Sequence, residues 1–268
     1  MRFSIDKGHT PLPRAFAAAC LALGLASPLA AQATPAAAPK TILAIGAHAG
    51  DMELTAGLVL VKQRQVDDRI VFLHLTLGER GHPTLGPSAY ADQKRREAQA
   101  AAKAIGAEAM FGPYRDGELP NDAAARQYVA DVIRRVRPSL IITHWRESLH
   151  RDHATTHAVV VDAVLLAAID TGKAGGARHR GARLWFAENW EDKEGFEPYL
   201  YVDVSGHMPA WTEMVKSYEF VRGEISSFEY LDYYTALATV RGAEARRAQA
   251  VAFDIDPFGK RRVLDAVP

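Results

Sequence analysis

The feature that most constrains the fold is a regular alternation of apolar, strand-like segments with longer helix-like segments. The strand-like segments are 41–47, 69–78, 107–112, 138–145, 182–189 and 199–205, and the helix-like segments are 52–64, 91–106, 122–137 and 152–170. The first of them, TILAIGA, is apolar throughout, which is typical of a strand buried on both faces. Such alternation indicates parallel βαβ units with right-handed crossovers. We therefore predict an α/β fold: a Rossmann-like three-layer α/β/α sandwich with a mostly parallel sheet.

The N-terminal residues have the pattern of a secretory signal peptide. Lys7 and Arg14 precede the apolar stretch 15–30, and the small residues of 31–33 follow it, where a signal peptidase would cut. The stretch is shorter than a bilayer span of roughly 20 residues, which disfavours a retained anchor. The prediction is a secreted or periplasmic protein. Its segments are a signal peptide at 1–33, a short linker at 34–40 and one domain at 41–268.

A single cysteine, Cys20, lies inside the predicted signal peptide. Its use as a lipid anchor is disfavoured, because Ala17 stands where a lipobox usually has a larger aliphatic residue. The mature chain then has no thiolate, so any transition metal must be held by His, Asp or Glu. Lys+Arg and Asp+Glu number 32 each, so no net field favours nucleic acid or an anionic membrane as a partner. We expect a small-molecule ligand, and the sequence leaves the oligomeric state open.

Polar residues follow the predicted strands at the end where ligands bind in such sheets. His48 and Asp51 follow the first strand, Glu79 and Arg80 the second, and Asp116 the third. The run HWRESLHRDH follows the fourth. The turn after the first strand lacks the G-x-G-x-x-G spacing of a dinucleotide site, which disfavours a nucleotide-dependent enzyme.

Two of these groups together could hold a metal ion. Each residue alone has an ordinary structural explanation, such as Asp51 capping a helix. Jointly, His48 and Asp51 with the run HRDH at 150–153 supply the ligands of a facial His/Asp/His site, which would accept zinc, Fe(II) or Co(II). His153 and His157 form an alternative pair at i, i+4, but the glutamate of a His-Glu-x-x-His motif is missing between them.

The same stretches resemble the zinc-dependent PIG-L/LmbE-like de-N-acetylase family, whose signatures are His-Pro-Asp-Asp-Glu after the first strand and His-x-Asp-His further on. The resemblance spans roughly residues 40 to 255. It is carried, in order, by GAHAGDMELTAG, TLGERG, KRREAQAAAKAIGAE, YRDGEL and HRDHATTH.

The resemblance implies a zinc site and residues for catalysis around it. The implied zinc ligands are His48, Asp51 and His153. His150 matches the histidine that stabilises the oxyanion or protonates the leaving amine, and Asp152 matches the carboxylate that orients it.

Further candidates are expected around the substrate. Arg80 and Asp116 are predicted substrate contacts, although Arg80 fits a solvated loop residue equally well. Glu188, Asn189 and Trp190 follow a predicted strand and are candidates for lining the pocket.

One position departs from the family signature. Gly50 stands where the family has the aspartate that deprotonates the zinc-bound water. Three explanations stay open: zinc-bound hydroxide acts alone on a more reactive bond such as an ester, the protein binds without hydrolysing, or another carboxylate takes over. The candidate carboxylates are Glu53, Glu79, Asp116 and Asp152. If a base is missing, aspartate at position 50 should raise any amidase rate.

The sequence therefore predicts a zinc-dependent hydrolase that deacetylates an N-acylated amino sugar or a similar small amide. The alternatives are a metal-dependent carbohydrate-binding protein with weak or no hydrolysis, and a carbohydrate esterase.

Overall fold

The computed structural model describes residues 39–169 and 176–261. The predicted signal peptide, its cleavage site and Cys20 lie outside these residues, so the N-terminal boundaries and the destination of the protein stay predictions. Among the described residues, no helix combines the length and the apolar character needed to cross a membrane.

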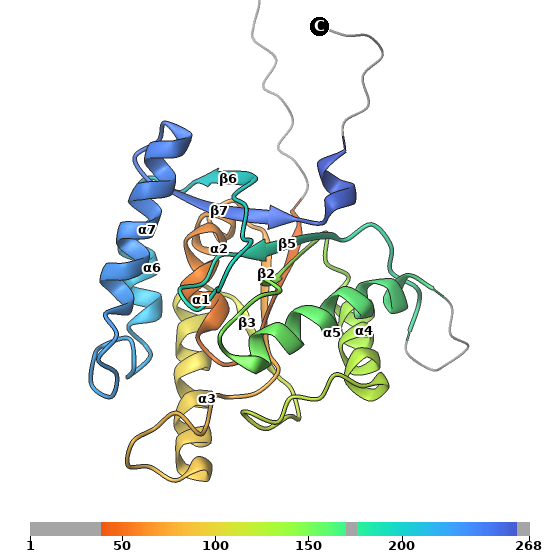
Figure 1. The fold of residues 1–268 in the computed structure, drawn as a ribbon, viewed down its shortest axis with the longest axis horizontal. Helices are drawn as coiled ribbons and strands as arrows, with labels where there is room; N and C mark the ends of the chain where they lie inside the picture. Colours follow the sequence, from red (N-terminus) through yellow and green to blue (C-terminus); the bar gives the residue numbers. More distant parts are fainter. Residues whose placement is uncertain (1–38, 170–175, 262–268) are drawn as a thin grey trace, which may run out of the picture. The chain divides into compact units, whose positions relative to one another are not determined.

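A seven-stranded sheet of order β3-β2-β1-β4-β5-β7-β6 forms the centre of the structure (Figure 1). Strands β1 to β5 run parallel, and β7 pairs antiparallel with both β5 and β6. The predicted α/β fold with a mostly parallel sheet is thus confirmed. The strands are β1 (Thr41–Gly46), β2 (Arg69–His74), β3 (Glu108–Phe111), β4 (Leu140–His144), β5 (Arg183–Ala187), β6 (Leu200–Asp203) and β7 (Ala250–Ile255).

Helices cover both faces of the sheet (Figure 1). One face carries α1 (Asp51–Thr55), α2 (Gly57–Arg64), α3 (Pro87–Ala104), α6 (Met208–Val215) and α7 (Tyr230–Ala245). The other face carries α4 (Ala123–Val136) and α5 (Arg151–Ala168). A single turn of 3₁₀ helix, η1 (Pro257–Lys260), follows β7.

The central strand shows why the layers form. Successive side chains of a strand point to opposite faces, so an uninterrupted apolar strand feeds two cores at once. In β1, Ile42 and Ala44 belong to the core under α2 and α6, whereas Leu43 and Ile45 belong to the core under α4 and α5. All four side chains are at most 2% exposed.

The structure differs from the sequence prediction in two places. The helix predicted at 52–64 is broken at Ala56 into α1 and α2. The C-terminal part adds α6, α7 and the antiparallel strand β7, which the strand–helix alternation does not announce. Antiparallel pairing at this edge depends on which strands meet in space, and local sequence patterns carry no such information.

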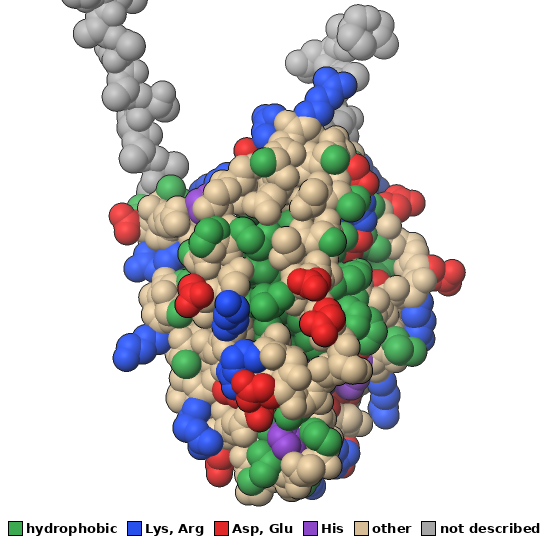
Figure 2. All heavy atoms as spheres, turned by 90° about the vertical axis from the view of Figure 1, so that its left-hand side faces the viewer, with side chains coloured by type: hydrophobic (Ala, Val, Ile, Leu, Met, Phe, Trp, Pro, Cys, Tyr) green, Lys and Arg blue, Asp and Glu red, His purple; other side chains and the backbone are tan. Residues whose placement is uncertain are grey.

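The face formed around α6 and α7 mixes apolar, acidic and basic side chains (Figure 2). No large patch of one sign is visible on this face. This agrees with the equal numbers of acidic and basic residues in the chain.

Candidate metal centre and pocket

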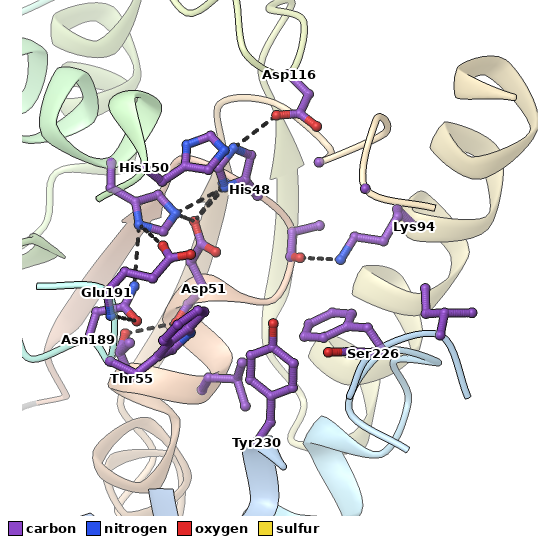
Figure 3. Close-up of a pocket in the computed structure, with 18 of the residues that line it drawn as sticks. His48, Asp51, Thr55, Lys94, Asp116, His150, Asn189, Glu191, Ser226 and Tyr230 are labelled. Atoms are coloured by element: carbon purple, nitrogen blue, oxygen red, sulfur yellow. Dashed lines mark hydrogen bonds and ion pairs between the residues drawn. The ribbon is translucent and has the colours of Figure 1, made fainter. Parts of the chain in front are cut away.

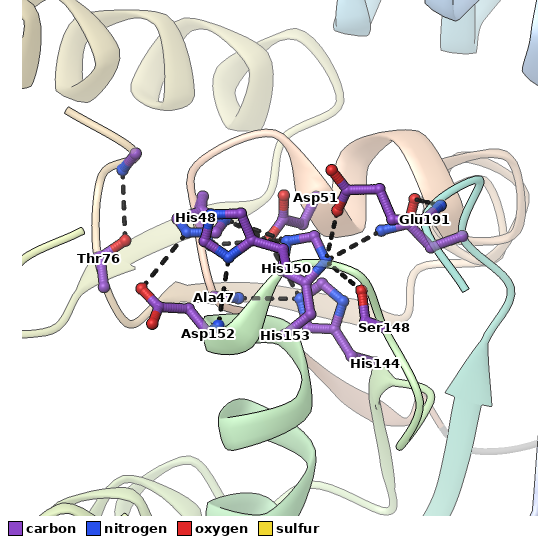
Figure 4. A network of polar contacts seen from close by, with 12 residues as sticks. Ala47, His48, Asp51, Thr76, His144, Ser148, His150, Asp152, His153 and Glu191 are labelled. Atoms are coloured by element: carbon purple, nitrogen blue, oxygen red, sulfur yellow. Dashed lines mark hydrogen bonds and ion pairs between the residues drawn. The ribbon is translucent and has the colours of Figure 1, made fainter. Parts of the chain in front are cut away.

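The polar residues that the sequence singles out meet at the carboxyl ends of β1 and β4. These two strands are hydrogen-bonded neighbours, and the chain leaves them toward opposite edges of the sheet. Such a reversal of strand order opens a crevice between the two loops that follow the strands. The loop after β1 carries His48 and Asp51, and the loop after β4 leads to His150 and His153 at the start of α5 (Figure 4).

Three donor atoms converge in this crevice. His48 Nδ1 lies 3.1 Å from His153 Nε2. Asp51 Oδ2 lies 3.4 Å from each of these two nitrogens. Ligands about 2.1 Å from one tetrahedral ion are separated by roughly 3.4 Å. The triangle therefore has the dimensions of one face of a tetrahedral zinc site.

The far nitrogen of His48 faces carboxylates. His48 Nε2 lies 3.2 Å from Asp116 Oδ1 and 3.6 Å from Asp152 Oδ2. Carboxylates on this side favour a proton on Nε2, and that tautomer directs the Nδ1 lone pair into the triangle. Metal-binding histidines are commonly oriented by such a carboxylate on their second nitrogen.

His153 is held in the same way by a different carboxylate. Its Nδ1 lies 3.0 Å from Glu191 Oε2 and 3.3 Å from both Ser148 Oγ and Asn189 Nδ2. A proton on Nδ1, the nitrogen that faces the Glu191 carboxylate, directs the Nε2 lone pair toward His48 and Asp51. Glu191 comes from the loop after β5, and no motif in the sequence points to it.

The charges around the triangle favour a bound cation. Burial alone lowers the pKa of His48, but Asp51, Asp116 and Asp152 outweigh it and raise that pKa well above its usual value. Burial opposes ionisation of Asp51, yet the neighbouring His153 and His48 hold the pKa of its carboxyl well below the usual range. Two nitrogen lone pairs and a carboxylate that face one another repel unless a proton or metal ion lies between them. The donor set therefore fits a divalent transition metal.

A further histidine lies behind the triangle. His144, the last residue of β4, is 1% exposed, and its ring stacks on His153 with centroids 4.1 Å apart. Its Nε2 is 3.1 Å from Asp51 Oδ2. Burial and the neighbouring His153 lower the pKa of His144 to about 4, so its ring is neutral. Asp51, His144 and His153 form a second possible ligand group, which the sequence does not distinguish from a buried histidine.

His150 and Asp152 lie at the first turn of α5. His150 is the N-cap, and its Nδ1 accepts a hydrogen bond from the backbone N–H of Asp152. The neutral ring then carries its proton on Nε2. The Asp152 carboxylate is directed to His48 and to the backbone N–H of Gly117, at 2.7 Å for the latter. The group of Asp152 that contacts the His150 ring is thus its backbone N–H. The Asp152 carboxylate lies near His48 instead.

A cavity of about 290 Å³ opens over the triangle (Figure 3). His48, Asp51, His150 and His153 form one part of its wall. Five aromatic residues also line it, namely Tyr90, Trp190, Phe220, Tyr230 and Tyr234. Polar groups and aromatic rings therefore share the wall of a space large enough for a small molecule.

The predicted substrate contacts separate in the structure. Asp116 lines the cavity, and its Oδ2 accepts a hydrogen bond from the backbone N–H of Arg80. The Arg80 guanidinium is instead paired with Glu118 at the surface, where the two side chains are 42% and 50% exposed. Arg80 is thus not among the residues that line the cavity, and its role as a substrate contact stays a prediction.

The remaining candidates lie after β5 and on α5. Asn189 and Trp190 line the cavity as predicted, whereas Glu188 pairs with Arg241. His157 Nδ1 lies 2.9 Å from the backbone oxygen of His144, away from the triangle, so His153 and His157 do not form a metal pair.

Position 50 lacks the aspartate that serves as the base in the family. Gly50 has φ 110°, and a β-carbon there would lie 2.7 Å from Phe220 Cζ. Among the proposed replacement carboxylates, Glu53 accepts a hydrogen bond from Tyr218 in the core, and Glu79 accepts one from the backbone of Asp116. Asp116 is the one of the four that lines the cavity.

The comparisons with known proteins agree with this geometry. Residues 43–164 match the family model described as GlcNAc-PI de-N-acetylase. The chain is 28% identical over 178 residues to a 1D-myo-inositol 2-acetamido-2-deoxy-alpha-D-glucopyranoside deacetylase from Kineococcus radiotolerans, covering 52% of this chain and 49% of the relative. Over residues 43–164 the chain is thus similar to the PIG-L/LmbE-like family.

The relatives of this chain do not share one reaction. A 4-oxalmesaconate hydratase from Pseudomonas putida is 26% identical over 218 residues, covering 78% of this chain and 82% of the relative. Among solved structures, N,N'-diacetylchitobiose deacetylase from Pyrococcus horikoshii superposes with a TM-score of 0.72 at 18% identity, covering 81% and 84% of the two chains. At this identity the superposition shows the shared fold alone. The comparisons therefore leave open whether the chain is a deacetylase or a hydratase.

Proposed function

We propose that this protein is a metal-dependent hydrolase that removes the acyl group from an N-acylated amino sugar or a similar small amide. The observation that carries the proposal is the convergence of His48, Asp51 and His153 in the wall of a cavity that His150 also lines. The predicted signal peptide supports export, so we infer that the enzyme works outside the cytoplasm.

The residues around the cavity have different proposed roles in the reaction. When bound by His48, Asp51 and His153, a divalent ion supplies a Lewis acid for water and acyl oxygen, and the family resemblance favours zinc. His150 presents its Nε2–H to the cavity, where it can donate to an oxyanion or to a departing amine. Asp116, the one of the four candidate carboxylates that lines the cavity, is our proposed replacement for the missing base.

The shape of the cavity supports a small, partly apolar substrate. A wall that combines aromatic rings and polar groups suits a sugar ring, which offers an apolar face and hydroxyl edges. The deacetylases among the relatives are named for sugar amides. An N-acylated sugar-like molecule is therefore the proposed substrate.

Hydration of a carbon–carbon double bond is the second candidate. It is favoured by the hydratase relative, which matches most of both chains, and by the absence of a side chain at Gly50. Both reactions add water with the help of the same donor triangle. They differ in the bond that the substrate presents.

The proposal is tested by metal content and turnover on the same protein. The mature protein, its His153→Ala variant and its His157→Ala variant are analysed for bound metal, and each is assayed on N-acetylglucosamine, an acetyl ester and 4-oxalmesaconate, with and without chelator. We expect His153→Ala to lose nearly all metal and turnover. His157→Ala removes a histidine from the same helix outside the triangle and should keep both.

Each outcome selects one interpretation. Chelator-sensitive release of acetate from the amide supports the deacetylase, whereas release from the ester alone supports an esterase. Turnover of 4-oxalmesaconate alone supports the hydratase. Stoichiometric metal without any turnover points to a binding protein, and full metal retention by His153→Ala contradicts the ligand assignment.

A further inference from the structure

A buried lysine lies beside the candidate metal centre and has no part in the proposed reaction. Lys94, on α3, is 4% exposed and lines the same cavity as His48 and Asp51 (Figure 3). Its Nζ lies 3.8 Å from the point that a β-carbon on residue 50 would occupy. The place where the family carries a negative side chain is therefore bordered in this chain by a cation.

The contacts of Lys94 are those that hold a protonated amine. Its Nζ donates a hydrogen bond of 2.5 Å to the backbone oxygen of Ala49. The same Nζ lies 4.1 Å from the ring centroid of Phe220 and 4.7 Å from that of Tyr218. The negative faces of aromatic rings attract cations. All three contacts favour the ammonium form and fix its position.

Within residues 39–169 and 176–261, no carboxylate pairs with this ammonium at ion-pair distance; its close partners are the carbonyl and the rings. The carboxylates of the cavity wall already have partners: Asp51 and Asp116 contact His48, and Glu191 contacts His153. A buried charge without a counterion is costly and is usually paired or functional. The structure thus holds a buried ammonium beside the cavity whose close contacts are a carbonyl oxygen and aromatic rings, while Glu97, Asp51, Glu53 and Asp116 act on it only from beyond ion-pair distance.

The charge state of Lys94 agrees with this geometry. Burial lowers its pKa to about 8, and Glu97, Asp51, Glu53 and Asp116 limit the decrease. Below that pH the amine is mainly protonated. Burial has removed the water that would stabilise the ammonium. A negatively charged ligand would stabilise it in place of that water.

We propose that Lys94 is a specificity-determining residue that binds a carboxylate of the substrate close to the bond that reacts. The substrate class is then an acidic N-acyl compound, such as an N-acylated amino sugar that also carries a carboxylate. This inference rests on the proposed function, because it assigns the substrate of the same cavity. It gives Gly50 a role, since a carboxylate at that position would pair with Lys94 and compete with the substrate.

The experiment compares a charged ligand with its neutral counterpart. Binding of N-acetylmuramate and of N-acetylglucosamine, which differ by a lactyl carboxylate, is measured by calorimetry on the metal-loaded mature protein at pH 7. We expect the unmodified protein to bind N-acetylmuramate at least about tenfold more tightly. Lys94→Met should reduce this ratio to near one, and Lys94→Arg, which keeps the charge, should retain most of it.

A matched control removes a cation from the same helix. Arg96 is exposed on α3, so Arg96→Met makes the same change in net charge without touching the cavity, and its binding ratio should be unchanged. The thermal midpoint of each variant shows that it is folded. Equal binding of both ligands by the unmodified protein, absence of binding by either, or an unchanged ratio in folded Lys94→Met would overturn the proposal.

Turnover measured on the same samples separates the two proposals. A Lys94-dependent binding ratio without hydrolysis of either ligand would sink the hydrolase proposal and leave the carboxylate site standing. Hydrolysis of both ligands with a ratio near one would do the reverse.

Discussion

At the scale of single residues, Gly50 shows how a missing side chain is built into the structure. Its φ of 110° lies in the region that favours glycine, and the Phe220 ring fills the space that a side chain would need. Gly50 therefore does not only lack the side chain of the base. The backbone conformation and the position of Phe220 both require glycine at this position.

This changes the expected effect of restoring aspartate. The sequence predicts that Gly50→Asp raises an amidase rate. In the structure the substitution combines backbone strain with a clash, so we expect it to lower the free energy of unfolding by about 2–4 kcal/mol and to leave turnover unimproved. Denaturant titration and the N-acetylglucosamine assay measure the two effects.

A second substitution tests the cause. Phe220→Ala removes the ring that contacts the added β-carbon, so Gly50→Asp should cost less stability in the Phe220→Ala background than alone. Equal costs in both backgrounds would show that Phe220 is not the obstacle.

Asp192, in the loop that carries Glu191, gives a prediction about pH. Burial raises the pKa of Asp192 to about 7, and Glu188 and Glu191 add to the increase. Its unfolded pKa is about 3.9. Because the folded pKa is the higher one, the stabilising contribution is full below about pH 4 and is lost as the pH rises through 7.

The substitution Asp192→Asn removes this titration and keeps an oxygen for the hydrogen bond that Asp192 Oδ2 accepts from the backbone N–H of Asn189. We expect the variant to be more stable than the unmodified protein at pH 8, by about 1–2 kcal/mol, and equally stable at pH 4. Urea unfolding at both pH values checks this. A difference that does not change with pH would contradict the assignment.

Among the helices, the junction between α1 and α2 is closely packed against α6. A β-carbon on Gly57 would lie 2.7 Å from Met214 Cε and 2.8 Å from Trp211 Cδ1, both on α6. The glycine thus lets α6 approach the start of α2. Close approach of α6 also brings Trp211 Nε1 to the backbone oxygen of Glu53, to which it donates a hydrogen bond of 2.9 Å.

Gly57→Ala therefore sets helix propensity against packing. Alanine favours a helix over glycine by about 1 kcal/mol, but overpacking a core costs about 1–3 kcal/mol. Because the fully buried Trp211 has little room to move, we expect a net loss of about 1–2 kcal/mol in the free energy of unfolding. Chemical denaturation measures it. A net gain in stability would show that α6 shifts freely.

At the scale of the whole molecule, a metal ion would join segments far apart in the chain. His48 and His153 are separated by 105 positions, and their nitrogens lie 3.1 Å apart. A ligand that binds only the folded state stabilises it by RT ln(1 + [L]/Kd), about 4 kcal/mol at a thousand times Kd.

Chelation should therefore lower thermal stability. We expect the midpoint of thermal unfolding to decrease by several degrees with chelator and to recover on adding zinc. Differential scanning calorimetry gives both values. His153→Ala should unfold at the same temperature with and without chelator, and a chelator effect that persists in this variant would place the metal elsewhere.

The sequence by itself determined the α/β class, the parallel strands and the group of polar residues at one end of the sheet. Local patterns can be recognised in the sequence without the structure. The uninterrupted apolar strands are one such pattern, and the spacing of His48, Asp51 and the run at 150–153 is another. Ligands bind at the carboxyl ends of the strands in parallel sheets, and these polar residues follow such strand ends. The candidate centre could therefore be predicted from the sequence.

The tertiary structure decided the partners of these residues. Glu191 on His153, the Asp152 carboxylate on His48, the surface position of Arg80 and the buried ammonium of Lys94 depend on loops and helices from distant parts of the chain. No local pattern marks Lys94, which stands in a run of basic residues typical of a solvated helix. Its burial and its place beside Gly50 are set by packing, because the energy of a charge depends on its surroundings in space and not on its neighbours in sequence.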